Sequence, residues 1–507
     1  MLPVVLPSGI PWLSLIWLSL LVPALIIAFL PPQQKQAIRL VGTLFAFVSL
    51  LLSALVFVGY NYASGPRLQF LEQLPWLPDV GINYVLGVDG ISTPLLLLNG
   101  LVIFTGALVS WNIEDRAREY WVLLLLLAAG VYGVFVSVDL FLFFVFYELA
   151  VLPMYLLIGI WGSTRREYGA LKLTLYLMGG SALVIIGMIA VYFGSGLRSF
   201  DLRVLSQLGL YSQQLQVWAF PVLFLGFAVL AGMFPFHTWS PTGHVAAPTA
   251  VSMLHAGVLM KLGAYGCIRV AMAILPLGAN TWLLPIAICT LIGAVYGAAI
   301  AAVQRDMKFM IGYSSVSHMA LTLMGIAAGN ELGLSGAVLQ MFAHGVMTAL
   351  FFAVVGRMVY ERTHTRQFPE LGGLFSVMPF AGVVFIIAGL SSMGMPGFAG
   401  FWAELNIFMG MWQRFPLIAV IATLSIPITA AYILRATRAT FFGPLKNPAF
   451  RNLPRLTWQE YVAASLLAAV VIASGIAPGY LTEPIASGVA PIAAAVREAA
   501  QFVAMGR

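Results

Sequence analysis

The stretch LFLFFVFYELAVLPMYLLIGIW (140–161) holds one charged side chain, Glu148, in an otherwise apolar run. An α-helix of about 20 such residues is long enough to cross the roughly 30 Å hydrocarbon core of a bilayer. The whole chain of 507 residues is 61% hydrophobic and 8% charged, whereas about a quarter of the residues of a soluble domain carry charge. Such a chain cannot cover a surface that faces water, so a soluble enzyme is excluded and an integral membrane protein is predicted.

Apolar runs of this kind recur along the chain and predict an all-α polytopic protein of about 14 transmembrane helices. The first run is too long for a signal-peptide core, so we expect it to remain as a membrane helix. Residues 484–505 are rich in alanine and predict an amphipathic terminal helix in the membrane interface. The predicted spans are 12–30, 39–60, 88–110, 119–137, 140–161, 170–193, 217–236, 250–274, 281–303, 309–328, 334–359, 376–395, 416–440 and 460–477.

The number of basic residues alternates between high and low in successive loops, in agreement with the predicted spans. Loops after even-numbered spans, with the adjoining helix ends, hold only Arg67, Arg198, Arg203, Arg269 and Arg414. Loops after odd-numbered spans hold Lys35, Arg39, Arg116, Arg118, Arg165, Arg166, Arg305, Lys308, Arg357, Arg362, Arg366, Arg435, Arg438, Lys446, Arg451 and Arg455. Because lysine and arginine accumulate in cytoplasmic loops, the loops after odd-numbered spans are predicted to be cytoplasmic and both termini to lie on the opposite side.

Two predicted spans carry helix breakers and then continue as apolar sequence. Span 7 runs into FPFH (234–237), and span 12 meets GMPG (394–397) and resumes as FWAE (401–404). Interrupted membrane helices occur where backbone lines a transport site. We therefore predict that helices 7 and 12 are broken.

Four charged side chains fall inside or beside predicted spans, where an ionisable group is expensive and marks a functional site by default. They are Glu148 in span 5, Lys172 near the start of span 6, Lys261 in the middle of span 8 and Glu404 after the break in span 12. The alternative for each is a structural ion pair, and Lys172 could also extend its amine to the interface.

Histidines extend this set, because imidazole takes up and releases protons near neutral pH. His237 and His244 flank Pro241, His255 opens span 8, and His318 and His344 lie deep in spans 10 and 11. A single buried histidine is more often a satisfied core residue, but five beside lysine and glutamate favour a proton relay. We expect His364, in a loop, to lie at the surface.

Metal, nucleotide and nucleic-acid sites have little support. Cys267 and Cys289 both sit in apolar runs and cannot form a four-thiolate cluster, so they are predicted to be buried hydrophobes. The spacing of His237 and His244 across a proline is unlike that of zinc ligands. No glycine-rich fingerprint follows a strand, and the basic residues are scattered, which argues against nucleic acid as a partner. Axial haem ligation by His318 and His344 is a weaker alternative.

The motifs around these residues resemble the antiporter-like subunits of proton-translocating NAD(P)H:quinone oxidoreductases, respiratory complex I and its photosynthetic relatives. The resemblance covers about residues 85–445. Within the family, this chain is most similar to chain 4 (subunit M). It rests on FYEL (146–149), PMY (153–155), FPFHTW (234–239), APTA (247–250), AGVLMK (256–261), YSSVSHM (313–319), AHG (343–345) and the region from GMPG (394–397) to Glu404.

The resemblance implies two inverted five-helix repeats, each with a broken helix at its centre. It divides the chain into N-terminal helices 1–3 (1–110), a first repeat of helices 4–8 (119–274), a second repeat of helices 9–13 (281–440), and helix 14 with the amphipathic segment (460–507). It also implies that Glu148, Lys261 and Glu404 form the proton path. His318 and His344 would lie on the same axis, with Lys172 and His237 as further relay candidates.

The chain departs from the family pattern at Leu230. Family members usually carry a lysine at this position, paired with the span-5 glutamate. Because an ionised carboxylate alone in the membrane interior is costly, Glu148 must protonate or find another cation. A direct contact with Lys172 looks too long, so we expect a water-bridged Lys172, with His237 as the rival partner. The departure suggests the cyanobacterial forms that serve CO2-uptake complexes, ahead of a respiratory form.

Three functions remain after this comparison. The first is a proton-translocating, non-redox subunit of a quinone-reducing assembly, whose quinone, iron–sulfur clusters and electron donor (NAD(P)H or ferredoxin) are bound by partner subunits. The second is a subunit of a monovalent cation/proton antiporter, and the third is a structural membrane module that has lost pumping. The first implies membrane and peripheral partner subunits and lipid contacts. It places the chain in a bacterial plasma membrane or, as we favour, a cyanobacterial thylakoid membrane.

The alternation of basic residues makes the topology testable. Single cysteines at Ser163 and Ser199 should be labelled by a membrane-impermeant maleimide from opposite sides of the membrane, because a single predicted span separates the two positions. Labelling of both positions from the same side would contradict the span assignment.

Overall fold

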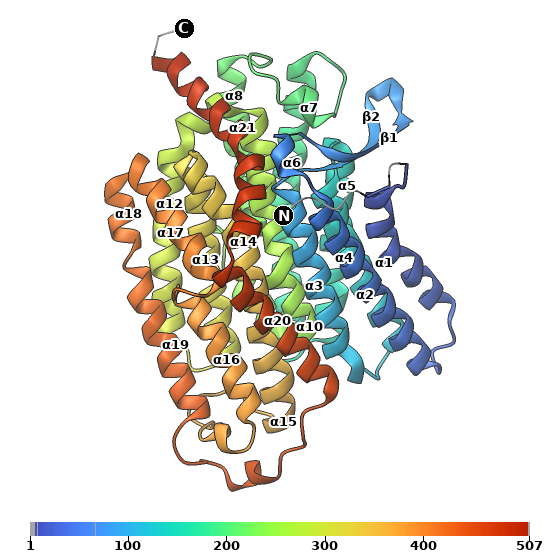
Figure 1. Cartoon of the computed structure of the whole chain (residues 1–507), viewed down its shortest axis with the longest axis vertical. Coiled ribbons are helices and arrows are strands. Elements are labelled where there is room, and N and C mark those ends of the chain that lie inside the picture. Colours follow the sequence, from blue (N-terminus) through green and yellow to red (C-terminus); the bar gives the residue numbers. More distant parts are fainter. Residues whose placement is uncertain (1–5, 8, 66, 505–507) are drawn as a thin grey trace.

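The computed structural model describes residues 6–7, 9–65 and 67–504. Most of this chain is helical, and the helices run side by side along the long axis of the molecule (Figure 1). Among the described residues, 13 helices are long and apolar enough to cross a membrane. The predicted all-α, multi-pass architecture is therefore confirmed.

The N-terminal part contains three long helices and one β-hairpin. The helices are α1 (Trp12–Phe29), α2 (Lys35–Gly59) and α3 (Ser92–Val109), with short 3-10 turns η1 (Tyr62–Ser64), η2 (Pro78–Val80) and η3 (Ser110–Asn112). Strands β1 (Gln69–Leu77) and β2 (Ile82–Val88) pair antiparallel, with Leu74 opposite Tyr84. The sequence analysis did not predict this hairpin and wrongly assigned residue 88 to a span. Gly81, with φ of 75°, occupies the left-handed conformation that the hairpin turn requires.

The middle of the chain forms predicted spans 4 to 8. It contains α4 (Ala117–Val136), α5 (Leu140–Trp161), α6 (Arg166–Ser195), α7 (Leu202–Leu205), α8 (Gln213–Ala231), α9 (Trp239–Ala246) and α10 (Thr249–Leu254). The π-helical turns η4 (His255–Leu259) and η5 (Cys267–Met272) flank α11 (Met260–Gly266). Together α10, η4, α11 and η5 make one continuous span. Span 7 is broken between α8 and α9, as predicted.

The following part forms predicted spans 9 to 13. It contains α12 (Pro276–Val303), α13 (Met307–Ala328), α14 (Glu331–Phe352), the π turn η6 (Ala353–Tyr360), α15 (Glu361–Thr363), η7 (Leu374–Ser376), α16 (Pro379–Ser392), α17 (Ala399–Arg414), α18 (Pro416–Ala422) and α19 (Ser425–Phe441). The predicted span 12 is split into α16 and α17, of 14 and 16 residues, so neither is long enough to be counted as a span. This break accounts for the difference between 13 observed long helices and about 14 predicted ones.

The chain ends with η8 (Pro448–Asn452), α20 (Trp458–Ile476) and α21 (Gly479–Ala504). Helix α21 crosses one face of the bundle (Figure 1) and packs against α12 and α14. Its buried apolar residues recur at helical spacing: Leu481, Ile485, Val489, Ile492 and Val496. The predicted terminal helix is thus amphipathic, with its apolar face turned to the bundle.

Glu460 ties α20 to the end of span 11. Its carboxylate is fully buried and pairs with Arg357 at 2.9 Å and with Arg362 at 2.7 Å. The same side chain closes a capping box with Thr457 at the start of α20. A buried carboxylate needs this kind of compensation, because an unpaired charge there would cost several kcal/mol.

Burial separates a central core from peripheral helices. In α1 and α2, 33% of the most apolar window is buried, whereas the windows of Thr249–Met272 and Glu331–Thr363 are 100% buried. These two central spans carry Lys261 and His344. The division into two inverted repeats remains a prediction. It is supported by matching aspartate caps, since Asp139 and Asp306 accept backbone N–H groups at the starts of α5 and α13.

Candidate functional site

Lys261 lies on α11, directly after the π turn η4, and is fully buried. Its Nζ donates to the carbonyl oxygen of Ala256 and lies 2.7 Å from His344 Nδ1. None of the ion pairs formed by the described part of the chain includes Lys261. The amine is therefore held by a carbonyl and an imidazole, and no carboxylate fixes its protonation state.

Two glycines bring Lys261 and His344 together. Gly257 on η4 and Gly345 on α14 face each other so closely that a Cβ on Gly345 would lie 2.6 Å from the carbonyl oxygen of Gly257. Small residues permit this approach of two membrane helices. Gly345 directly follows His344, so the crossing point also fixes the depth at which the imidazole meets the amine.

His318 on α13 continues the chain of polar groups toward the second half. Its ring lies 5.4 Å from the His344 ring, and its Nδ1 lies 3.4 Å from Glu404 Oε1. Two residues that the sequence analysis missed complete its surroundings. Ser392 Oγ lies 3.0 Å from Nε2, and Gln340 Nε2 lies 3.2 Å from Nδ1.

The contacts of His318 depend on its protonation. A protonated Nδ1 donates to the Glu404 carboxylate, whereas an unprotonated Nδ1 accepts from the Gln340 amide. The geometry thus offers the ring two alternative partners, one for each protonation state of Nδ1. Because both ring nitrogens face protein partners, His318 is a poor axial haem ligand, which weakens the haem alternative.

The break in span 12 positions Glu404. Helix α16 ends at Ser392, α17 begins at Ala399, and Gly394 between them has φ of 66°. A Cβ on Gly394 would lie 2.6 Å from Glu404 Oε2, so glycine is needed both for its backbone conformation and for the space beside the carboxylate. Glu404 is buried at this point, next to His318.

The other candidate histidines lie at the break in span 7 and at the start of span 8. His237 stacks on Phe234, with ring centroids 5.7 Å apart, and meets Tyr296 edge-on at 5.5 Å. His244 and His255 form a second buried pair, with ring centroids 4.0 Å apart. The ring nitrogens of these three histidines have no hydrogen-bond partner among the described residues. His364 is exposed, as expected.

Glu148 is not joined to a cation. No ion pair of the described residues includes Glu148 or Lys172, and Lys172 instead lies over the Tyr168 ring at 5.7 Å. Ser181 of α6 faces the Glu148 carboxyl without closing a hydrogen bond. Lys172 lies nine residues before Ser181 on α6, or about 13 Å along the axis. The structure therefore shows no direct Glu148–Lys172 contact, and a bridge would need several waters.

Leu230 lies one turn beyond Phe227, whose ring meets the Tyr147 ring edge-on at 5.9 Å. Tyr147 precedes Glu148, so Leu230 lies on the helix that packs against this part of α5. Among the described residues, no three His, Cys, Asp or Glu side chains gather into a possible metal site.

The sequence analysis could have found Gln340 as a site residue, because it precedes His344 by four residues and so lies on the same helix face.

We expect Gly345→Ala to destabilise the protein, because the added Cβ meets the backbone of Gly257. Overpacking of this kind costs about 1–3 kcal/mol. Gly179→Ala is the matched control, since nothing lies within 4 Å of its added Cβ. Thermal unfolding in detergent measures both variants, and equal stability of the two would contradict the close crossing.

We expect Leu230→Lys to ionise Glu148. Long helical side chains point back toward the helix N-terminus, which directs the new ammonium to the level of Phe227 and Tyr147. The C=O band of the protonated carboxyl should weaken in infrared difference spectra. Leu230→Met serves as the uncharged control. If both variants leave the same Glu148 band, residue 230 does not face the carboxyl.

The chain is similar to known proteins over most of its length. Residues 137–429 match the family model described as NADH:quinone oxidoreductase/Mrp antiporter, TM. The NADH-quinone oxidoreductase subunit M of Rhodobacter capsulatus is 36% identical over 90% of this chain and 91% of its own length. NAD(P)H-quinone oxidoreductase chain 4 2 of Microcystis aeruginosa is 37% identical over 86% of this chain and 80% of its own.

Solved structures show the same fold. A chain of respiratory complex I from Thermus thermophilus matches with a TM-score of 0.86 and 28% identity, over 96% of this chain and 99% of that one. A chain of the Mrp complex from a Dietzia species matches with a TM-score of 0.82 and 21% identity, over 96% and 99%, which shows the fold alone. On its sequence and its structure, the chain belongs to the NADH:quinone oxidoreductase/Mrp antiporter family of transmembrane subunits.

Proposed function

We propose that this chain is a proton-translocating, non-redox membrane subunit of a quinone-reducing assembly of the complex I type. One observation carries the proposal: Lys261, His344, His318 and Glu404 lie in a row from span 8 to the break in span 12, with polar contacts at both ends and the two imidazole rings 5.4 Å apart between them. Buried ionisable groups are costly in a membrane and are kept where they conduct charge. The 36% and 37% identical relatives carry the names of quinone oxidoreductase subunits, which supports the same assembly.

The geometry suggests how a proton moves along this series. Lys261 passes a proton to His344 Nδ1, and His344 releases a proton from Nε2, which has no partner among the described residues, to a bridging water that carries it to His318. Protonated His318 donates to Glu404 in place of accepting from Gln340. Glu404 then releases the proton beside the break in span 12. A charge arriving near Lys261 would start the sequence, because Coulomb forces act strongly at short range in a medium of low dielectric constant.

Glu148 is proposed as the entry acid on the side of the first repeat. Without a lysine at position 230, its carboxyl has no fixed cation, so its proton exchange depends on other groups. Lys172 and His237 remain candidates for that exchange, although neither touches Glu148 in this structure. The loss of the lysine is also the observation that favours a structural module without pumping.

Electron transfer belongs to partner subunits in this proposal. Quinone, iron–sulfur clusters and the electron donor would be bound by them, and the chain contributes the proton path and contacts with neighbouring membrane subunits and lipids. A cation/proton antiporter subunit is the alternative. Purification in mild detergent separates the two, since co-purifying quinone-reductase subunits support the first and antiporter subunits alone support the second.

Lys261→Met is expected to abolish proton uptake into vesicles that contain the whole assembly. The substitution removes the only proton-exchanging group on α11 that contacts His344 and keeps a similar side-chain length. Proton uptake is followed with a pH-sensitive dye, and assembly is followed on native gels. Lys446→Met, in an exposed loop, is the matched control and should pump normally. Undiminished proton uptake by the Lys261 variant would refute the proposed path.

A further inference from the structure

A cavity of about 220 Å³ lies at the end of span 8 that the topology places away from the cytoplasm. Its walls come from the loops around the β-hairpin, α4, α7, η5 and α21. Arg203, which is partly exposed, lies at its edge, so the cavity reaches the surface. Three of its lining residues, Asp89, Tyr265 and Arg269, form a connected polar group.

Arg269 and Asp89 form a partly buried ion pair in the wall of this cavity. The other carboxylate oxygen of Asp89 accepts the backbone N–H groups of Ile91 and Ser92, at 3.0 and 3.1 Å, just before and at the start of α3. Arg269 Nε also donates to the Tyr265 hydroxyl at 3.3 Å. The pair is neutral as a whole, so it does not repel a cation as a lone arginine would.

Tyr265 links this pair to the helix of Lys261. Lys261, Tyr265 and Arg269 are spaced by four residues, which places them on one face, with Tyr265 about 6 Å and Arg269 about 12 Å from Lys261 along the axis. The Tyr265 hydroxyl donates to the carbonyl oxygen of Phe135 at 3.2 Å. The π turns η4 and η5 stand on either side of this segment, and π turns in α-helices occur frequently at functional sites.

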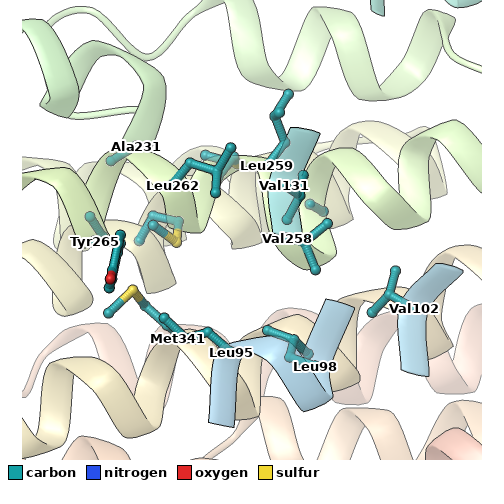
Figure 2. Packing of buried hydrophobic residues seen from close by; sticks show 14 of the residues in the cluster. Leu95, Leu98, Val102, Val131, Ala231, Val258, Leu259, Leu262, Tyr265 and Met341 are labelled. Carbon is teal, nitrogen blue, oxygen red and sulfur yellow. The ribbon is translucent and has the colours of Figure 1, made fainter. Parts of the chain in front are cut away.

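An apolar layer separates Lys261 from Tyr265. Leu98 of α3 packs against Gly345 beside His344, at the level of Lys261, and Leu95 lies about one turn nearer the outward end of α3. Figure 2 shows Leu95, Leu98 and Val102 along one side of the Lys261 helix, and Met341 pointing toward Tyr265. A layer without polar side chains excludes water when closed and conducts protons only when it takes up water.

We propose that the cavity bounded by Asp89, Tyr265 and Arg269 is a second, outward mouth of the proton route, gated by the apolar layer beneath Lys261. The inference rests on the proposed function, because it needs Lys261 to exchange protons. Two outlets then serve one central lysine: this mouth in the first half of the chain and Glu404 in the second half.

Atoms and charges balance in the proton transfer through this mouth. An N–H bond of the Lys261 ammonium breaks, its electron pair stays on Nζ, and the proton leaves on water that enters the apolar layer. The remaining lone pair of the Tyr265 hydroxyl accepts a hydrogen bond from that water, while its own proton stays hydrogen-bonded to the Phe135 carbonyl, so the tyrosine positions the water and remains neutral. One positive charge reaches the cavity, and Lys261 is left as a neutral amine until a proton from the entry side reloads it.

Three variants of the whole assembly in vesicles test the mouth. Tyr265→Phe keeps the ring that packs against Phe135 and Phe143 but removes the hydroxyl, and should lower proton release in part. Glu404→Gln should also lower it in part, and the double variant should abolish it. Tyr211→Phe, which removes another buried hydroxyl, should release protons normally. If Glu404→Gln alone stops release while Tyr265→Phe has no effect, the second mouth is refuted.

Different experimental results would refute the second mouth and the proposed function. Retained pumping by the Lys261→Met variant refutes the proposed function. Loss of pumping in that variant, together with normal proton release by the Tyr265→Phe variant, refutes the mouth alone.

The accessibility of the cavity gives a readout that is independent of activity. A cysteine at Ala273, in the cavity wall, should react with an impermeant maleimide from the outside, in a background without Cys289. Reaction only from the cytoplasmic side would overturn the outward mouth.

Discussion

The contact between Gly257 and Gly345 is the constraint on which the rest of the site depends. Without a side chain at either position, two fully buried helices approach until the backbone of one meets that of the other. Lys261 then reaches His344 rather than lipid or water. In a bilayer, apolar burial between helices gives little driving force, so close packing of small residues has to hold such helices together. The contact between Lys261 and His344 therefore depends on the tight packing of the two helices.

Polar groups along this chain are satisfied to different degrees. His318 has three polar neighbours, and Lys261 has a carbonyl and an imidazole. By contrast, the ring nitrogens of His237, His244 and His255 meet no partner among the residues described. An unsatisfied buried polar group costs about 1–3 kcal/mol. The structure thus combines a well-connected segment in its second half with a poorly connected one near the break in span 7.

The surroundings of Glu148 differ from the family pattern because residue 230 is a leucine and not a lysine. The carboxyl retains its place on α5, but the position that holds a lysine in the resembling family is Leu230, and the nearest polar side chain of α6 is Ser181. Lys172 stands too far along α6 to replace the missing cation directly. The near-equal identity to the Rhodobacter and Microcystis subunits does not connect this change with one branch of the family or with one type of membrane.

The sequence by itself determined the spans, the two breaks and the ionisable residues within apolar runs, because hydrophobic length and helix breakers act locally along the chain. It missed the β-hairpin, whose strands of nine and seven residues lie between two long apolar runs that dominate the pattern. Only the tertiary structure decided that Lys261 meets His344, that His318 bridges to Glu404 through a site shared with Gln340 and Ser392, and that Glu148 meets no cation. Those contacts join residues far apart in sequence. They depend on the depth and the face at which two helices cross, which helical periodicity alone does not fix and glycine packing does.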